Sequence, residues 1–143
     1  MGVSGSGKTS VGAALAARLG VAFVEGDSLH PAANIEKMAA GIALADEDRW
    51  PWLDRIGAAI AERRAAGTGV VVSCSALRRS YRDRLRAAVD GLRFVHLSGD
   101  RALLGKRLAG RKGHFMPPSL LDSQFATLET PTSEDGTIVV DVA

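Results

Sequence analysis

The first nine residues constrain this chain more than any other segment. Residues 2–9 read Gly-Val-Ser-Gly-Ser-Gly-Lys-Thr and match every fixed position of the phosphate-binding pattern G-x-x-x-x-G-K-[ST]. Glycines there let consecutive backbone N–H groups converge on phosphate oxygens where side chains would collide. In such a loop the lysine, Lys8, reaches the β- and γ-phosphates, and the hydroxyl of Thr9 is placed to bind Mg²⁺. We therefore predict a nucleotide site here, built from Gly2, Ser4, Gly5, Ser6, Gly7, Lys8, Thr9 and Ser10.

Composition limits the class of protein. A chain of 143 residues indicates one domain, spanning residues 1–143, and 46% apolar with 24% charged residues is ordinary for a globular protein. The net charge of +2 is too small to indicate a nucleic-acid partner. Cys74 is the only cysteine, so no intrachain disulfide forms, which fits a reducing compartment. No apolar run approaches the ~18 residues of a membrane span. We expect a cytoplasmic protein that binds neither membranes nor nucleic acid.

Helical and strand patterns alternate along the chain, which is typical of a parallel α/β sheet with helices on both faces. Val11, Leu15 and Leu19 share one face of the first predicted helix. Leu53 and Ile56 point inward from a longer one, together with Ile60. The predicted helices are residues 8–19, 34–40, 48–66, 81–89, 101–108 and 119–128, and the predicted strands are 21–24, 70–72, 92–97 and 137–142.

Acidic residues follow the first predicted strand. Parallel sheets bind ligands outside the carboxyl ends of their strands, and Glu25 and Asp27 lie at such an end. A carboxylate there can accept a hydrogen bond from a substrate hydroxyl and orient it toward a γ-phosphate, the role we predict for Asp27. Glu25 can hold a Mg²⁺-bound water. The alternative for each acid is a solvated loop residue or a helix cap.

Residues 110–118 read Gly-Arg-Lys-Gly-His-Phe-Met-Pro-Pro. This segment is basic and flanked by glycine and proline, so we predict a lid that brings cationic charge to the transferring phosphoryl group. A solvated basic loop is the alternative.

Several further segments occur over nearly all of the chain and in a consistent order. They are EGDSLHP (25–31), Asn34, Lys37-Met38, Gly41, Leu44, DEDRWPWL (46–53), CSALRR (74–79), Tyr81-Arg82-Asp83, RKGHF (111–115), Ser123-Gln124-Phe125 and Thr127-Leu128-Glu129. Together these segments resemble the gluconate kinase family. The resemblance implies ATP-dependent phosphorylation of D-gluconate to 6-phospho-D-gluconate, in gluconate catabolism that feeds the pentose phosphate pathway. It also implies ATP and Mg²⁺ as cofactors, a cytosolic homodimer, and the P-loop fold of nucleoside-monophosphate and shikimate kinases.

The chain departs from this family in two places. No strand pattern precedes the phosphate loop, and no helix pattern follows the last predicted strand. In the family the first strand lies at the centre of the sheet, so we expect a gap between the strands at 70–74 and 92–97 and a poorly anchored loop. We also expect the catalytically competent gene product to be longer at its N-terminus.

The resemblance also assigns roles to matching positions. Lys8, Asp27 and Arg111 resemble the catalytic residues, and Arg107 and Arg111 the side chains that bind the nucleotide. A sugar acid needs a guanidinium fork for its carboxylate and short polar groups for its hydroxyls. The candidates for the fork are Arg49 and Arg79, and those for the hydroxyls are His30, Lys37, His114 and Gln124.

Each of these candidates has a plainer alternative. His30 could cap a turn, Lys37 and Arg79 could be solvated, and Gln124 could bond to backbone. Two alternatives for the whole protein also stay open. Shikimate and nucleoside-monophosphate kinases share the fold and the loop, although they differ from this chain in the segment 25–53. A chain without its central strand could also be an inactive nucleotide-binding remnant.

Overall fold

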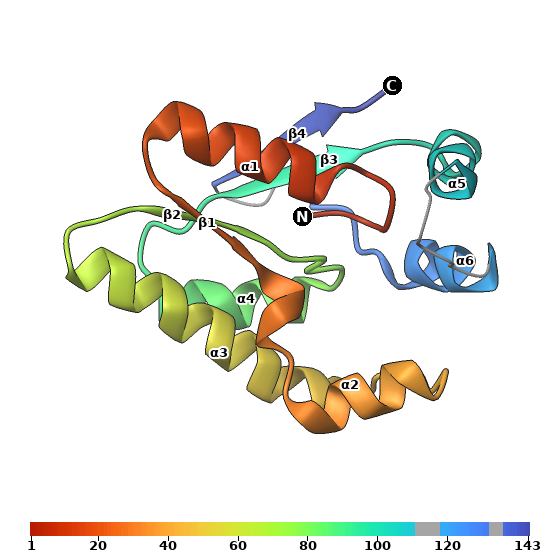
Figure 1. Cartoon of the computed structure of the whole chain (residues 1–143), viewed down its shortest axis with the longest axis horizontal. Coiled ribbons are helices and arrows are strands. Elements are labelled where there is room, and N and C mark those ends of the chain that lie inside the picture. The colour runs from red at the N-terminus through yellow and green to blue at the C-terminus, as the bar shows by residue number, and fades with distance from the viewer. Residues whose placement is uncertain (111–117, 132–135) are drawn as a thin grey trace.

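The computed structural model describes residues 1–110, 118–131 and 136–143. The predicted alternation is confirmed, with most boundaries shifted by one or two residues, and a short 3₁₀ helix was not predicted (Figure 1). In chain order the elements are α1 (Lys8–Leu19), β1 (Ala22–Glu25), η1 (Gly26–Leu29), α2 (Ala32–Ala39), α3 (Asp46–Ala65), β2 (Val70–Ser73), α4 (Arg79–Ala88), β3 (Phe94–Ser98), α5 (Arg101–Ala109), α6 (Pro118–Thr127) and β4 (Thr137–Asp141).

The strands form one layer between helices. In Figure 1, α1 covers one side of the strands, α3 and α4 cover the other, and α5 and α6 stand together at one end. All pairing is parallel, with β1 on β2 and β3 on β4. The predicted parallel α/β architecture with helices on both faces is therefore confirmed.

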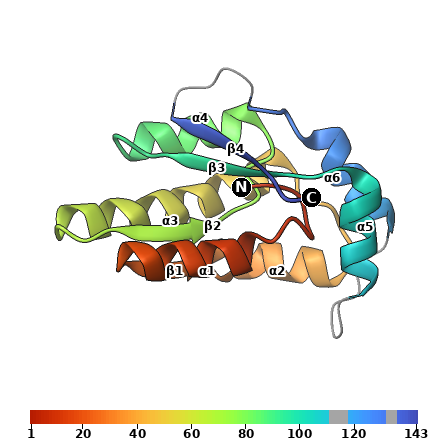
Figure 2. The ribbon, with the colours of Figure 1, turned by 90° about the horizontal axis from the view of Figure 1, so that it is seen from above.

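The sheet is divided into two pairs of strands. The described strands form two separate two-stranded sheets, so β2 and β3 are not bonded to each other. The N-terminus lies between them (Figure 2). There the Met1 ammonium donates to the carbonyl of Val95 at 2.6 Å, the N–H of Leu97 donates to the carbonyl of Met1 at 2.9 Å, and Gly2 N–H donates to Ser75 at 3.2 Å. The predicted gap between these strands is confirmed.

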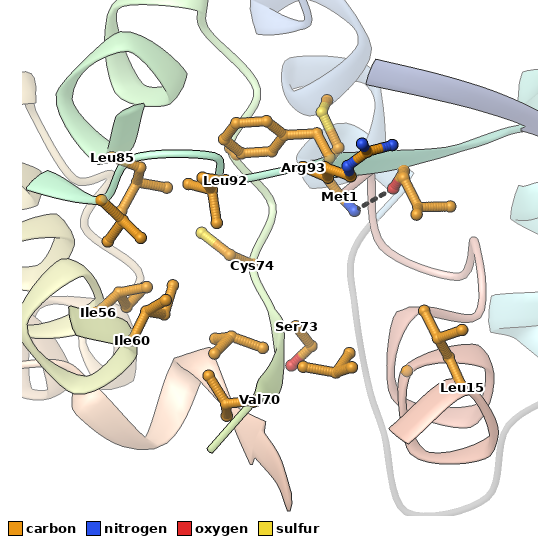
Figure 3. Close-up of a pocket in the computed structure, with 18 of the residues that line it drawn as sticks. Met1, Leu15, Ile56, Ile60, Val70, Ser73, Cys74, Leu85, Leu92 and Arg93 are labelled. Carbon is orange, nitrogen blue, oxygen red and sulfur yellow. Dashed lines mark hydrogen bonds between the residues drawn. The ribbon is translucent and has the colours of Figure 1, made fainter. Parts of the chain in front are cut away.

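An apolar cleft of about 540 Å³ continues this gap (Figure 3). Val70 and Cys74 border it from the β2 side, Leu92 from the segment before β3, and Leu15 from α1. The cleft explains a departure from the sequence pattern of α1. Val11 and Leu19 lie on its rim and are 40% and 62% exposed, while Gly12 and Ala16 carry the buried face of the helix. The face that the pattern predicted therefore borders the cleft instead of a closed sheet.

Two hydrophobic clusters support the two ends of the strand layer. The larger one joins α3, α4 and β2 around Trp52, Leu53, Ile56 and Leu85, as the inward pattern of α3 predicts. The second joins the phosphate loop to α5 and α6 through Val3, Leu104 and Leu121, with Leu77 beside them. Burial of such side chains stabilises the fold by about 1.5–3 kcal/mol each. The second cluster ties the loop to the helices at the end of the layer.

None of the helices in the described part of the chain is long and apolar enough to cross a membrane.

Candidate active site

The phosphate loop has the backbone that its glycines predict. Gly5 and Gly7 have φ of 82° and 97°, which side-chain-bearing residues rarely adopt. A Cβ atom at Gly5 would also lie 2.9 Å from Leu108 and 3.1 Å from the carbonyl of Leu104, so a larger residue would push the loop off α5. Gly7 is the N-cap of α1 and makes no side-chain cap. The N–H groups that open α1 are therefore not capped by that residue, as anion binding at a helix start requires.

Lys8 closes back over its own loop. Its Nζ donates to the carbonyls of Gly2 and Val3, both at 3.0 Å. These bonds hold the ammonium group beside the loop that the sequence assigns to phosphates. A lysine in this position supplies a mobile positive charge, which is the part that a P-loop lysine plays toward β- and γ-phosphates.

Thr9 and Glu25, the predicted metal residues, lie together. The hydroxyl of Thr9 donates to Glu25 at 2.7 Å, and that of Ser73 donates to the same carboxylate at 2.6 Å. Parallel pairing aligns Glu25 with Ser73, which explains the second bond. All these donor atoms are oxygens, as Mg²⁺ prefers, and Mg²⁺ sites usually combine one or two carboxylates with substrate phosphates. No group of three or more His, Cys, Asp or Glu that could hold a metal ion occurs among the described residues.

Asp27 lies on η1, directly after β1, and its side chain is exposed. The turn that carries it is firmly seated. Trp52 Nε1 donates to the carbonyl of Gly26 at 2.9 Å, and the N–H of Gly26 donates to the Ser73 hydroxyl at 3.2 Å. A carboxylate held this way on an exposed turn is accessible to an incoming hydroxyl group.

His30 is buried beneath the same turn. Its ring stacks on Trp52, with centroids 4.2 Å apart, and Asn34 Nδ2 donates to its Nδ1 at 3.1 Å. Burial lowers the pKa of His30, Arg49 lowers it further, and Asp27 opposes the shift. An Nδ1 that accepts a hydrogen bond assigns the proton to Nε2. His30 is therefore a neutral side chain that supports the turn.

Lys37 and Arg49 extend this region onto α2 and α3. Lys37 Nζ binds both carboxylate oxygens of Asp48, at 2.8 and 2.9 Å. These bonds and the N–H of Ala45 lower the pKa of Asp48. Because both bonds hold its ammonium group on the carboxylate, Lys37 is paired rather than solvated. The Arg49 guanidinium lies 5.4 Å from the Tyr81 ring, and its buried Nε has no hydrogen-bond partner among the described residues. A buried, unpaired N–H of this kind is suited to an anionic ligand.

Tyr81 was not singled out as a site residue from the sequence, although it falls in a segment that resembles the family. Its hydroxyl donates to Asp46 at 2.5 Å. Burial first, and then this bond, raise its pKa to about 12, while Arg49 and Arg78 act in the opposite direction. The neighbouring Arg79, the predicted second half of the guanidinium fork, is 66% exposed and faces Asp83 at 3.7 Å. Arg78 also acts electrostatically on the Tyr81 hydroxyl, so it is a further cation on this side of the site beside Arg49.

The remaining predicted residues lie at the other end of the site. Gln124 Oε1 accepts the backbone N–H of Ser4 at 2.7 Å, which is the backbone alternative weighed for it. Arg107 donates to the carbonyl of Val142 at 2.6 Å. Arg111 and His114, with the other residues from 111 to 117 of the predicted lid, lie outside the described residues.

Comparison with known proteins shows which family this chain resembles in sequence. An AAA domain family matches residues 1–131. A gluconokinase of Gluconobacter oxydans (strain 621H) is 52% identical over 140 residues, covering 98% of this chain and 79% of that protein. The chain belongs to the gluconokinase family. The thermosensitive gluconokinase of Escherichia coli (strain K12) is 49% identical over 97% of this chain and 74% of its own length.

A solved structure extends the likeness to three dimensions. The crystal structure of a gluconokinase from Sinorhizobium meliloti 1021 superposes with a TM-score of 0.90 at 58% identity, covering all of this chain and 80% of that one. Membership of the gluconokinase family also decides between the kinase families that the phosphate loop alone left open. The resemblance to this family is therefore confirmed.

Proposed function

We propose that this chain transfers the γ-phosphoryl group of ATP to a hydroxyl of D-gluconate, giving ADP and 6-phospho-D-gluconate. The observation that carries the proposal is the 52% identity to a gluconokinase over nearly the whole chain. The site supports it, because the chain combines an intact phosphate loop, an exposed acid, Asp27, after β1, and a buried arginine N–H, Arg49 Nε, without a partner among the described residues.

The loop would bind the phosphates of ATP through its backbone N–H groups and Lys8. Thr9 and Glu25 would hold Mg²⁺, which neutralises charge on the phosphate oxygens when bound. Lys8 would move from the carbonyls of Gly2 and Val3 to the phosphates, a short change for a flexible side chain. Arg111 from the predicted lid would add a second positive charge as the phosphoryl group departs.

On the acceptor side, Asp27 would orient the attacking hydroxyl and take its proton. The carboxylate of gluconate would bind Arg49, whose Nε is free of partners among the described residues, with Arg78 as the second cation near Tyr81. His30 and Lys37 are already bonded to Asn34 and Asp48, so their contribution to hydroxyl binding would run through that network. Catalysis in a cytosolic homodimer remains part of the proposal, and size-exclusion chromatography with light scattering tests the dimer.

The test is a coupled ADP-release assay with gluconate, shikimate and AMP as acceptors. We expect turnover with gluconate alone. Asp27→Asn should lower kcat by about 10²–10⁴, because it removes the proton acceptor but keeps the shape, and it should leave ATP affinity unchanged. Asp90→Asn, at an exposed acid outside the site, is the control.

Equal loss of ATP binding and rate in Asp27→Asn would assign Asp27 to the metal site. Nucleotide binding without turnover of any acceptor would favour the inactive remnant instead.

A further inference from the structure

Gln124 connects α6 to the phosphate loop, 120 residues away in the sequence. Its Oε1 accepts the N–H of Ser4 at 2.7 Å. The partner is a backbone N–H, so the side-chain atom that faces it must be the oxygen. One turn earlier on α6, Leu121 is 2% exposed and packs in the cluster that contains Val3 of the loop. The hydrogen bond is thus fixed by a packed interface.

The bonded N–H belongs to the peptide unit between Val3 and Ser4, and the other side of that unit serves Lys8. The carbonyl of Val3 accepts Lys8 Nζ at 3.0 Å and the N–H of Ser6 at 3.3 Å. In a planar trans peptide the N–H and C=O point in opposite directions. Fixing the N–H therefore fixes the direction of the carbonyl that holds the lysine.

We propose that Gln124 is a positioning residue for the phosphate loop, which acts through the Val3–Ser4 peptide to orient Lys8. The sequence alone had offered Gln124 as a ligand for a substrate hydroxyl. The structure favours the loop, because its oxygen is engaged there, while the acceptor-side residues His30, Lys37 and Arg49 lie on or beside η1, α2 and α3.

The loop needs such support because one of its flanks is open. On the side of β2 and β3, Lys8 of the loop borders the cleft, whereas α5 contacts the loop closely, as the position of Gly5 against Leu104 and Leu108 indicates. The loop was predicted to be poorly anchored, but Gln124 and the cluster around Val3 hold it from the helical side. The kinetic part of this inference rests on the proposed function, and the binding part does not.

The experiment compares Gln124→Met with wild type by titration with a non-hydrolysable ATP analogue in the presence of Mg²⁺. Methionine keeps the length of the side chain and removes the acceptor. We expect the Kd to rise about three- to tenfold, as for the loss of one neutral hydrogen bond. The KM for gluconate should stay within twofold. Ser123→Ala, at an exposed neighbour on the same helix, should match wild type.

A double-mutant cycle tests the route through Lys8. In a Lys8→Ala background, Gln124→Met should change the Kd by less than twofold, because the group that it orients is gone. Multiplicative effects in the cycle would overturn the proposal, as would an unchanged Kd in the single variant. If Gln124→Met raised the KM for gluconate and left the nucleotide Kd unchanged, Gln124 would be a ligand of the acceptor and the proposal would be wrong. These binding results stand even if no acceptor is phosphorylated, so failure of the inference and of the proposed function are distinguishable.

Discussion

Gly26 offers the sharpest test of how the fold positions the proposed catalytic acid. It lies between Glu25 and Asp27, where β1 turns into η1, and it has no positive φ. Alanine is therefore compatible with its backbone conformation. However, a Cβ atom there would lie 2.0 Å from the carbonyl oxygen of Ser73, and real Cβ atoms essentially never approach closer than 3.0 Å. The strand end and the turn must separate by about 1 Å in Gly26→Ala.

That shift acts on both stability and rate. It strains the bonds from Trp52 to the Gly26 carbonyl and from the Gly26 N–H to Ser73. Overpacking of this kind costs about 1–3 kcal/mol of unfolding free energy, which lowers the melting temperature of a chain of this size by about 3–10 °C. A 1 Å misplacement of Asp27 should lower kcat about 10²-fold. Nucleotide affinity should change little, since the phosphate loop is a separate segment.

The assays are thermal unfolding and steady-state kinetics with gluconate and ATP. Gly105→Ala on α5 is the matched control, because among the described residues its Cβ would meet only the tip of Arg101 at 3.1 Å and Leu121 at 3.7 Å. Alanine in that helix should leave kcat unchanged and add up to about 1 kcal/mol of stability. If Gly26→Ala melted and turned over like wild type, the turn would not be seated on β2 as the structure indicates.

Three further outcomes are expected. Lys8→Ala should lower turnover more than it weakens substrate binding, because its charge matters most as the γ-phosphoryl group departs; a rate within a few-fold of wild type would remove Lys8 from the site. The pKa of His30 is lowered by burial, so the unfolded chain binds the proton more readily, and unfolding free energy should fall as pH drops below about 6.5. Urea unfolding at pH 7.5 and 5.5 checks this. The difference in unfolding free energy between the two pH values should be smaller in His30→Gln than in wild type, and an equal difference would contradict the lowered pKa. The buried His96 is present in both proteins and contributes equally to both. A five-residue apolar strand joined ahead of Met1 should fill the cleft and pair with both β2 and β3. It should therefore raise the melting temperature and reduce the binding of an apolar dye. An unchanged melting temperature and unchanged dye binding would show that the cleft does not accept a strand.

Local patterns predicted most of the fold. The 12 residues of α1 were predicted without error. Gly20 caps the end of that helix, and Asp100 caps the start of α5 by accepting from the N–H of Leu103 at 2.8 Å. Such features depend on neighbours a few residues apart, and a single sequence contains them completely. The gap between β2 and β3 was predicted as well, because the family resemblance places the strand that feeds a phosphate loop between these two strands.

Other features required the tertiary structure. Val11 and Leu19 have the spacing of a buried helix face, and only the position of the cleft exposes them. Arg78 and Arg79 are adjacent in sequence and equivalent in chemistry, so only the fold shows that Arg78 acts electrostatically on Tyr81.

The sequence by itself determined the chemistry of this protein: a phosphate loop, an acid after the first strand, and family segments in a fixed order. Only the tertiary structure decided which of these groups act together. Ser73 meets Glu25 because two strands pair in register, and Gln124 meets Ser4 because α6 packs against the loop. Those partners are 48 and 120 residues apart. The physical reason is that the residue type determines which chemical groups a side chain can bond. Which of those groups lies within reach depends on packing between elements that are distant in the chain.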